Sequence, residues 1–159
     1  MTEETEMSDA DKKKELDELD DRYNKKFEEI TKEIEVFFNV NQFELAEESI
    51  KHISKMHYYN SKLSEEKLLL FKIKRKMDEI HGVLYEKYRF NNSFKVTTKG
   101  EVDEWINRDI RWQKISTRYE NQKIMVDHYS RVVDSIRDKG YMIKNLIDLK
   151  KIELGIRWV

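Results

Sequence analysis

The last third of the chain carries an unbroken alternation of three- and four-residue steps between side chains that are mostly apolar. Its members are Trp112, Ile115, Tyr119, Gln122, Val126, Tyr129, Val133, Ile136, Gly140, Ile143 and Ile147. Because an α-helix turns once in about 3.6 residues, these steps place the whole set on one face of a single helix. No proline interrupts this helix, or any other part of the 159 residues. The pattern predicts an all-α fold of long helices packed side by side.

Capping residues mark where the C-terminal helices begin and end. Thr98 and Glu101 form a capping box that opens a short helix through EVDEWIN, and Asp109 is placed to cap the long helix that follows. Gly155 is a suitable C-terminal stop. Gly140 lies on the apolar face, where it indicates either a close approach by another backbone or a bend.

Three further apolar patterns predict the N-terminal helices. Asn39 and Asn41 separate the first pattern from the second, whereas no strong breaker separates the second from the third, so we expect one helix near residues 42–89. Residues 94–97 alternate and predict a short extended segment. The patterns are Leu16, Leu19, Tyr23, Phe27, Ile30, Ile34 and Phe37; then Phe43, Ala46, Ile50, Ile53 and Met56 or His57; then the heptad-like Leu63, Leu70, Ile73, Met77, Ile80 and Leu84.

These patterns also predict the domain organisation. Residues 1–14 are charged and lack periodicity, which predicts a disordered acidic tail. Residues 15–159 predict one helical domain, with N-terminal helices over 15–89 and C-terminal helices over 99–155. The long C-terminal face is too long for one short partner helix in the same chain, so we expect it to hold a homo-oligomer together. The residues expected at that contact are Val126, Tyr129, Val133, Ile136, Gly140, Ile143 and Ile147.

Composition argues against several classes of function. The chain has no cysteine, which excludes a disulfide framework and a thiolate metal site. It has neither the roughly 20-residue apolar run that crosses a bilayer nor the apolar core of a signal peptide, so we expect a soluble, intracellular protein. The four glycines form no phosphate-binding loop and the four histidines are scattered. We therefore expect no enzyme, no metal and no cofactor.

Positive charge is concentrated in the middle of the chain. The net charge is -10 over residues 1–48, +7 over residues 49–99 and +2 over residues 100–159, which gives -1 in total. An acidic arm beside a basic block suggests an anionic partner for the block, for which the arm could compete.

The densest run of cations is FKIKRKM, residues 71–77. On a helix, Lys72, Arg75 and Lys76 fall on the side away from the apolar seam, and Lys74 flanks the seam. These four residues, called the basic ridge below, are either a solvated helix face or a contact for phosphate.

Basic and aromatic residues then alternate in LYEKYRF, residues 84–90. Lys87 and Arg89 suit the phosphates of single-stranded nucleic acid, and Tyr85 and Tyr88 suit stacking on its bases. The two tyrosines are equally suited to extending the core at the end of the helix, so both interpretations stay open.

The C-terminal segment YSRVVDSIRDKGYMIKNLIDLKKIELG resembles the C-terminal helix of the UvsY recombination mediators of myovirus-type bacteriophages. The helix start at Thr98 and the tyrosine-rich stretch at 85–90 follow the order of that family, so the resemblance covers roughly residues 27–155 and leaves out the first 25. The matching steps are Asp134-Ser-Ile136-Arg137, Lys139-Gly140-Tyr141, Ile143-Lys144 and Glu153-Leu-Gly155.

This resemblance implies an all-helical protein that forms rings of six or seven subunits in the cytoplasm of an infected bacterial host. Such mediators bind single-stranded DNA, contact a UvsX-type recombinase and the phage single-strand-binding protein, and help the recombinase replace that protein on the strand. The family's DNA contacts lie on a Lys-x-Arg step in the middle helix, for which Lys74-Arg75-Lys76 is the nearest match, with Lys87 and Arg89 as further candidates. The competing interpretation is a coiled-coil adaptor without a nucleic-acid role.

Overall fold

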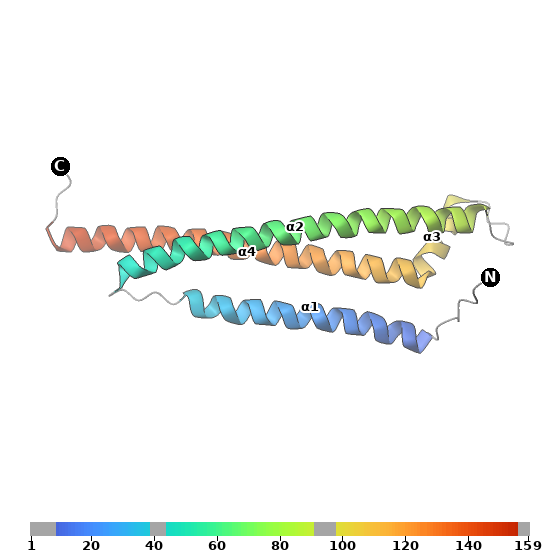
Figure 1. Ribbon diagram of the computed structural model, residues 1–159, viewed down its shortest axis with the longest axis horizontal. Coiled ribbons are helices and arrows are strands. Elements are labelled where there is room, and N and C mark those ends of the chain that lie inside the picture. The colour runs from blue at the N-terminus through green and yellow to red at the C-terminus, as the bar shows by residue number, and fades with distance from the viewer. Residues whose placement is uncertain (1–8, 39–43, 91–97, 156–159) are drawn as a thin grey trace. The chain divides into compact units, whose positions relative to one another are not determined.

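The computed structural model describes residues 9–38, 44–90 and 98–155, which form four α-helices (Figure 1). These are α1 (Asp9–Phe38), α2 (Leu45–Phe90), α3 (Lys99–Arg108) and α4 (Ile110–Glu153). No strand occurs in the described ranges, so the predicted all-α fold is confirmed. The extended segment predicted at residues 94–97 lies outside the described residues, and the predicted ring stays a prediction.

The predicted caps are present. The Glu101 amide donates to Thr98 Oγ1 at 3.3 Å, and the Glu101 carboxylate accepts from the Thr98 amide at 3.0 Å, which completes the capping box of α3. The amide of Arg111 donates to Asp109 Oδ1 at 2.9 Å at the start of α4. Gly155 has a φ of 68°, the left-handed conformation that ends a helix and favours glycine.

The extents of α2 and α1 confirm one sequence prediction and correct another. α2 runs without interruption for 46 residues, which confirms that the second and third apolar patterns belong to one helix. α1 begins at Asp9, so residues 9–14 of the predicted acidic tail are helical, while residues 1–8 lie outside the described part of the chain.

The described residues pack as two compact units, to which α1, α2 and α4 each contribute. Unit 1 joins residues up to Lys26 with Leu68–Ile124, and unit 2 joins Phe27–Lys67 with the residues from Met125 onward. In each unit a stretch of α2 lies antiparallel to a stretch of α4. The single domain predicted over residues 15–159 stays a prediction.

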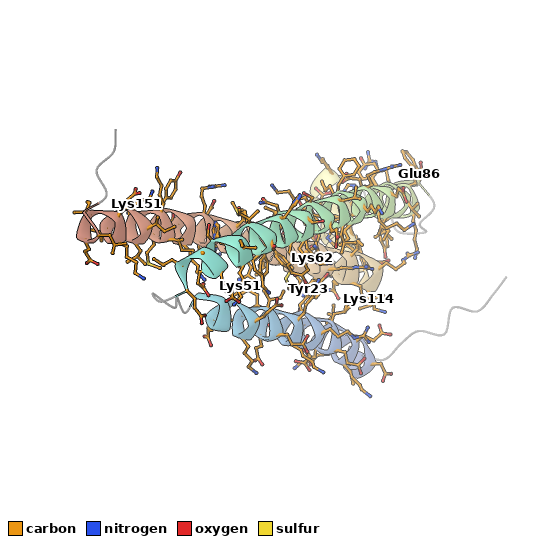
Figure 2. The ribbon with its side chains drawn as sticks, turned by 60° about the vertical axis from the view of Figure 1, so that its left-hand side comes forward. Tyr23, Lys51, Lys62, Glu86, Lys114 and Lys151 are labelled. Atoms are coloured by element: carbon orange, nitrogen blue, oxygen red, sulfur yellow. The ribbon has the colours of Figure 1, made fainter. Side chains whose placement is uncertain are left out.

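Unit 1 has its core where α3 folds back on the end of α2. Leu84, Val102 and Ile106 are at most 1% exposed, and Ile80, Tyr85, Tyr88 and Trp112 pack against them. α1 is joined to α4 in this unit by polar contacts: the Tyr23 hydroxyl donates to Gln122 Oε1 at 3.2 Å, and Lys114 forms an ion pair with Glu15. Figure 2 shows Tyr23 and Lys114 on these two helices.

Unit 2 buries most of the predicted C-terminal face. Gly140 packs closely against α2, because a Cβ at this position would lie 2.6 Å from His52 Nε2. The neighbour is a side chain, and not the backbone that the sequence suggested. Lys139 is almost fully buried and pairs with Glu48 at 3.2 Å. The buried apolar side chains are Ile30, Leu45, Tyr59, Leu63, Met125, Tyr129, Val132, Val133, Ile136 and Ile143.

This burial removes the reason for assigning the C-terminal face to an oligomer contact. Tyr129, Val133, Ile136 and Ile143 are each at most 5% exposed within a single chain, because α2 is a partner helix as long as α4. The expectation considered only a short partner helix, whereas the helix that covers the face has 46 residues. Whether these residues also take part in oligomerisation stays a prediction.

The second apolar pattern lies on an exposed side of α2. Ile50 and Ile53 are 69% and 66% exposed, and Ala46 is exposed as well, whereas Phe43 lies outside the described residues. The buried line of α2 instead passes through residues spaced by seven, of which one is charged. These are Leu45, Tyr59, Glu66 and Ile73, with the half-buried His52 on the same line.

Candidate nucleic-acid interface

The basic ridge lies on the exposed side of α2 in unit 1. Lys72, Lys74, Arg75 and Lys76 are all exposed, while Ile73 between them is only 4% exposed and faces the core. The helical spacing that places three cations away from the seam is therefore confirmed. The structure brings these four side chains together on one stretch of one helix.

Two of the four cations have carboxylate partners. Lys74 Nζ lies 2.8 Å from Asp78 Oδ1, and this hydrogen bond raises the pKa of Lys74. Lys76 Nζ lies 3.2 Å from Glu79 Oε2. These pairs are solvent-exposed, and exposed pairs contribute little to stability, so an incoming phosphate can replace the carboxylate.

Lys72 and Arg75 have no ion pair within the described ranges. Both project from the same turn of α2 on the side away from the seam. An unpaired exposed cation keeps its full attraction for an anion, so these two residues are the strongest phosphate-binding candidates of the ridge.

The aromatic candidates at the end of α2 belong to the core of unit 1. The Tyr88 hydroxyl donates to Asp109 Oδ2 at 3.0 Å, and its ring lies 6.2 Å from that of Trp105 in a stacked arrangement. Tyr85 stacks on His81 with ring centroids 6.3 Å apart. Both tyrosines pack against the buried cluster, so the structure favours the core interpretation for them.

The Tyr88–Asp109 contact shifts the pKa of both groups. Burial, followed by the hydrogen bond to Asp109, raises the pKa of Tyr88. Burial alone would raise the pKa of Asp109, but hydrogen bonds from Arg111 and Tyr88 outweigh it and lower that pKa. Asp109 therefore stays ionised and holds the ends of α2, α3 and α4 together.

Lys87 and Arg89 extend the basic surface to the end of α2. Both side chains are exposed, and the Lys87 ammonium lies 5.4 Å from the centroid of the Tyr88 ring. They lie more than three turns beyond Lys72 and Arg75 on the same helix.

Sequence reasoning missed Tyr119 of α4 as part of this surface. The ammonium groups of Lys74 and Lys123 lie 5.8 Å and 5.6 Å from its ring centroid, so one ring is placed between cations of two helices. The available signal was the position of Tyr119 on the face of α4 that turns toward α2.

The described ranges hold no group of three or more His, Asp or Glu side chains able to bind a metal ion. None of the described helices is long and apolar enough to cross a membrane. The arrangement of exposed cations suits binding of an anion.

Both the sequence and the fold of this chain are similar to those of known proteins. Residues 37–156 match the family model described as "Recombination, repair and ssDNA binding protein UvsY". Two crystal structures of the bacteriophage T4 recombination mediator protein UvsY match with TM-scores of 0.71 and 0.70, at 18% and 20% sequence identity. Each covers 80% of this chain, and the match covers 98% and 97% of those chains. A search of curated protein sequences gave no match.

Proposed function

This chain belongs to the UvsY family of recombination, repair and single-stranded-DNA-binding proteins, and we propose that it is a mediator that works by binding single-stranded DNA rather than by catalysis. The observation that carries the proposal is the family match over residues 37–156, which includes all of α2, α3 and α4. The shared fold with the T4 mediator supports it.

We assign the DNA contact to the basic ridge, with Lys87 and Arg89 as its extension. The ridge is exposed, and two of its cations have no ion pair in the described ranges. Phosphate binding by lysine and arginine releases counterions from the strand, so it needs no particular base sequence. Several subunits that bind one strand together gain avidity from contacts that are individually weak.

The wider proposal places the protein in the cytoplasm of an infected host, as a homo-oligomer of six or seven subunits. There it helps a UvsX-type recombinase replace the phage single-strand-binding protein. Self-association is supported by a line of exposed apolar residues near the end of α4, where Met142, Leu149 and Ile152 are 44%, 56% and 70% exposed. Such a line is typical of a surface that a second copy covers.

A binding experiment tests the core of this proposal. A fluorescein-labelled oligodeoxythymidylate should raise its anisotropy on addition of the protein, more strongly than a duplex of equal length. The recombinase ATPase on DNA covered by single-strand-binding protein should then start earlier when the protein is present. A protein that binds no single-stranded DNA at low salt would instead be the coiled-coil adaptor.

A mass measurement tests the self-association. Leu149→Asp with Ile152→Asp should lower the mass measured by light scattering while helicity is kept, because both side chains are exposed in the single chain. Val133→Asp with Ile136→Asp should instead unfold unit 2, since both side chains are buried. An unchanged mass in the first variant would remove the exposed line of α4 from the assembly contact.

A further inference from the structure

An exposed aromatic ring lies between two cations on the N-terminal half of α2, away from the basic ridge along the helix. Tyr58 is 47% exposed, and the ammonium groups of Lys55 and Lys62 each lie 5.9 Å from its ring centroid. The lysines lie three residues before and four residues after Tyr58, so all three side chains share one helix face. Figure 2 shows Lys62 on this helix, with Lys51 farther toward its N-terminus.

A buried neighbour holds the Tyr58 ring in place. The ring of Tyr59 is 1% exposed and meets the Tyr58 ring edge-on, with centroids 5.1 Å apart and planes at 84°. Edge-to-face contacts of this kind are favourable. Tyr58 is therefore an exposed ring with a defined orientation, whereas Tyr85 and Tyr88 are half-buried against core residues.

A hollow of about 610 Å³ opens beside this ring in unit 2. Its apolar lining comes from Tyr58 and from Ile50, which is 69% exposed and has no cover in the described part of the chain. Its remaining lining residues are Glu33, Lys51, Ser54 and Lys55. A nucleobase has two apolar faces and a polar edge, which matches an aromatic and aliphatic wall bordered by lysines.

The segment of α2 that borders the hollow contains lysines and no acidic residue. Residues 49–64 contain Lys51, Lys55 and Lys62 and no carboxylate. The carboxylates that pair with these lysines come from outside it: Glu47 lies 2.7 Å from Lys51, Glu65 lies 2.8 Å from Lys62 and Glu33 lies 3.3 Å from Lys55. All three pairs are exposed, so a phosphate can exchange for each carboxylate at little cost.

We propose that the hollow beside Tyr58 is a second contact for single-stranded DNA, in which a base stacks on Tyr58 against Ile50 while the adjoining phosphates pair with Lys55 and Lys62. The proposal rests on the proposed function and adds a base-stacking site to the phosphate contacts of the ridge. Single-strand-binding sites combine cations with exposed rings in this way, because every base has a face that can stack.

Helix α1 restrains this contact. Glu33, which pairs with Lys55 and lines the hollow, belongs to α1 and precedes the first residue of the family match at position 37. A carboxylate at this place competes with phosphate for Lys55. The predicted competition between the acidic arm and DNA is thereby assigned to Glu33, which competes with phosphate for Lys55.

The stacking is tested by replacing the ring while its apolar volume is kept. Tyr58→Leu should weaken binding of a labelled oligodeoxythymidylate about 5- to 150-fold, the loss expected for one stacked base. Tyr58→Phe keeps the ring and should bind within about twofold of the wild type. The control is Tyr141→Leu, which removes another exposed tyrosine, on α4, and should leave affinity unchanged.

The restraint is tested by neutralising one carboxylate of α1. Glu33→Gln should tighten binding at low salt, whereas Glu28→Gln makes the same charge change at another exposed position of α1 and should have a smaller effect. Lys55→Ala with Lys62→Ala should weaken binding and flatten the salt slope by about 0.7 for each phosphate that the variant no longer pairs with. Equal effects of the two glutamine variants would assign the change to overall charge and overturn the restraint.

Crosslinking keeps the site testable if Tyr58→Leu disturbs the fold. An oligonucleotide carrying 5-iodouracil should crosslink to Tyr58 of the wild-type protein on irradiation, as peptide mass spectrometry would show.

The possible results separate this site from the proposed function. If a ridge variant weakens DNA binding, while Tyr58→Leu binds like the wild type and no crosslink forms at Tyr58, this site alone is overturned. If the wild-type protein binds no single-stranded DNA, the proposed function is overturned as well. A lower mass of Tyr58→Leu with unchanged affinity would show that a second copy covers the hollow instead.

Discussion

Two stretches of α2 have similar apolar spacing and opposite positions in the fold. Ile73 and Leu84 of the later stretch are 4% and 0% exposed, while Ile50 and Ile53 of the earlier stretch are 69% and 66% exposed. Both stretches are helical, as their spacing predicted. The difference shows that spacing predicts which residues share a helix face, and that only the packing partners decide whether this face is covered.

The earlier stretch carries two lines of residues that compete for burial. The line that is buried contains Tyr59 and Glu66 together with the half-buried His52, so polar atoms mask it in a hydropathy pattern. The line of Ile50 and Ile53 is more apolar but lies on another side of the helix, and successive residues are about 100° apart. One partner helix cannot cover both lines.

Truncation of one apolar side chain from each stretch should give the largest contrast. Leu84→Ala should lower the free energy of unfolding by about 2–5 kcal/mol, because it removes a fully buried side chain next to Val102 and Ile106. Ile53→Ala should change it by less than about 0.5 kcal/mol. Urea titration followed by circular dichroism measures both. A large loss for Ile53→Ala would mean that a further copy of the chain covers the earlier stretch.

The two tyrosine environments give a smaller contrast. Tyr88→Phe removes the hydrogen bond to Asp109 and should cost about 0.5–1.5 kcal/mol of stability, with little direct effect on DNA affinity. Tyr58→Phe should leave stability nearly unchanged, because this exposed ring acts through its face. Thermal unfolding and oligonucleotide anisotropy on both variants would separate them. A loss of DNA affinity in a stable Tyr88→Phe would restore Tyr88 as a DNA contact.

A pH-dependent effect should be confined to unit 2. The pKa of His52 is lowered mainly by burial and also by the charge of Lys139. The pKa of His128 is lowered mainly by burial and also by the charge of Arg131. Their pKa values are therefore lower in the folded than in the unfolded state. Below the unfolded value of about 6.5 the unfolded chain binds more protons, so stability should fall as the pH drops through this window.

Differential scanning calorimetry between pH 7.5 and pH 5.5 would measure this loss. The double variant His52→Gln with His128→Gln should show a smaller fall of the melting temperature over that interval. The control His57→Gln replaces an exposed histidine of α2 and should keep the wild-type fall. An equal fall in all three proteins would assign the pH dependence to other groups.

Local signals made most of the fold predictable. The capping box at Thr98, the cap at Asp109 and the stop at Gly155 are set by residues next to each helix end, and all three are present. The exposure of Ile50 and the closure of the C-terminal face within one chain depend on which helices meet. A single sequence contains little information about such distant contacts.

The candidate site was predictable in part for the same reason. The exposure of the ridge follows from helical geometry alone, so this exposure was predicted correctly, while its role in DNA binding stays a prediction. The partners of Lys74 and Lys76 are within one turn, yet their pairing depends on side-chain conformation. Tyr58 was missed because its flanking lysines have the spacing of an ordinary solvated helix face, and only the hollow and its exposed ring distinguish it.

The salt dependence of single-stranded DNA binding by one double variant tests the central claim most directly. Lys72→Ala with Arg75→Ala removes the two ridge cations that have no ion pair in the described ranges, and it should flatten the log–log salt slope by about 1.4 for each engaged subunit. The matched control, Arg22→Ala with Lys25→Ala, removes an exposed arginine and lysine at the same spacing from α1, outside the family match. We predict a flattened slope and weaker binding for the ridge variant and an unchanged slope for the control. An unchanged slope and affinity in the ridge variant, with its helicity intact, would contradict the assignment of DNA binding to this surface of α2.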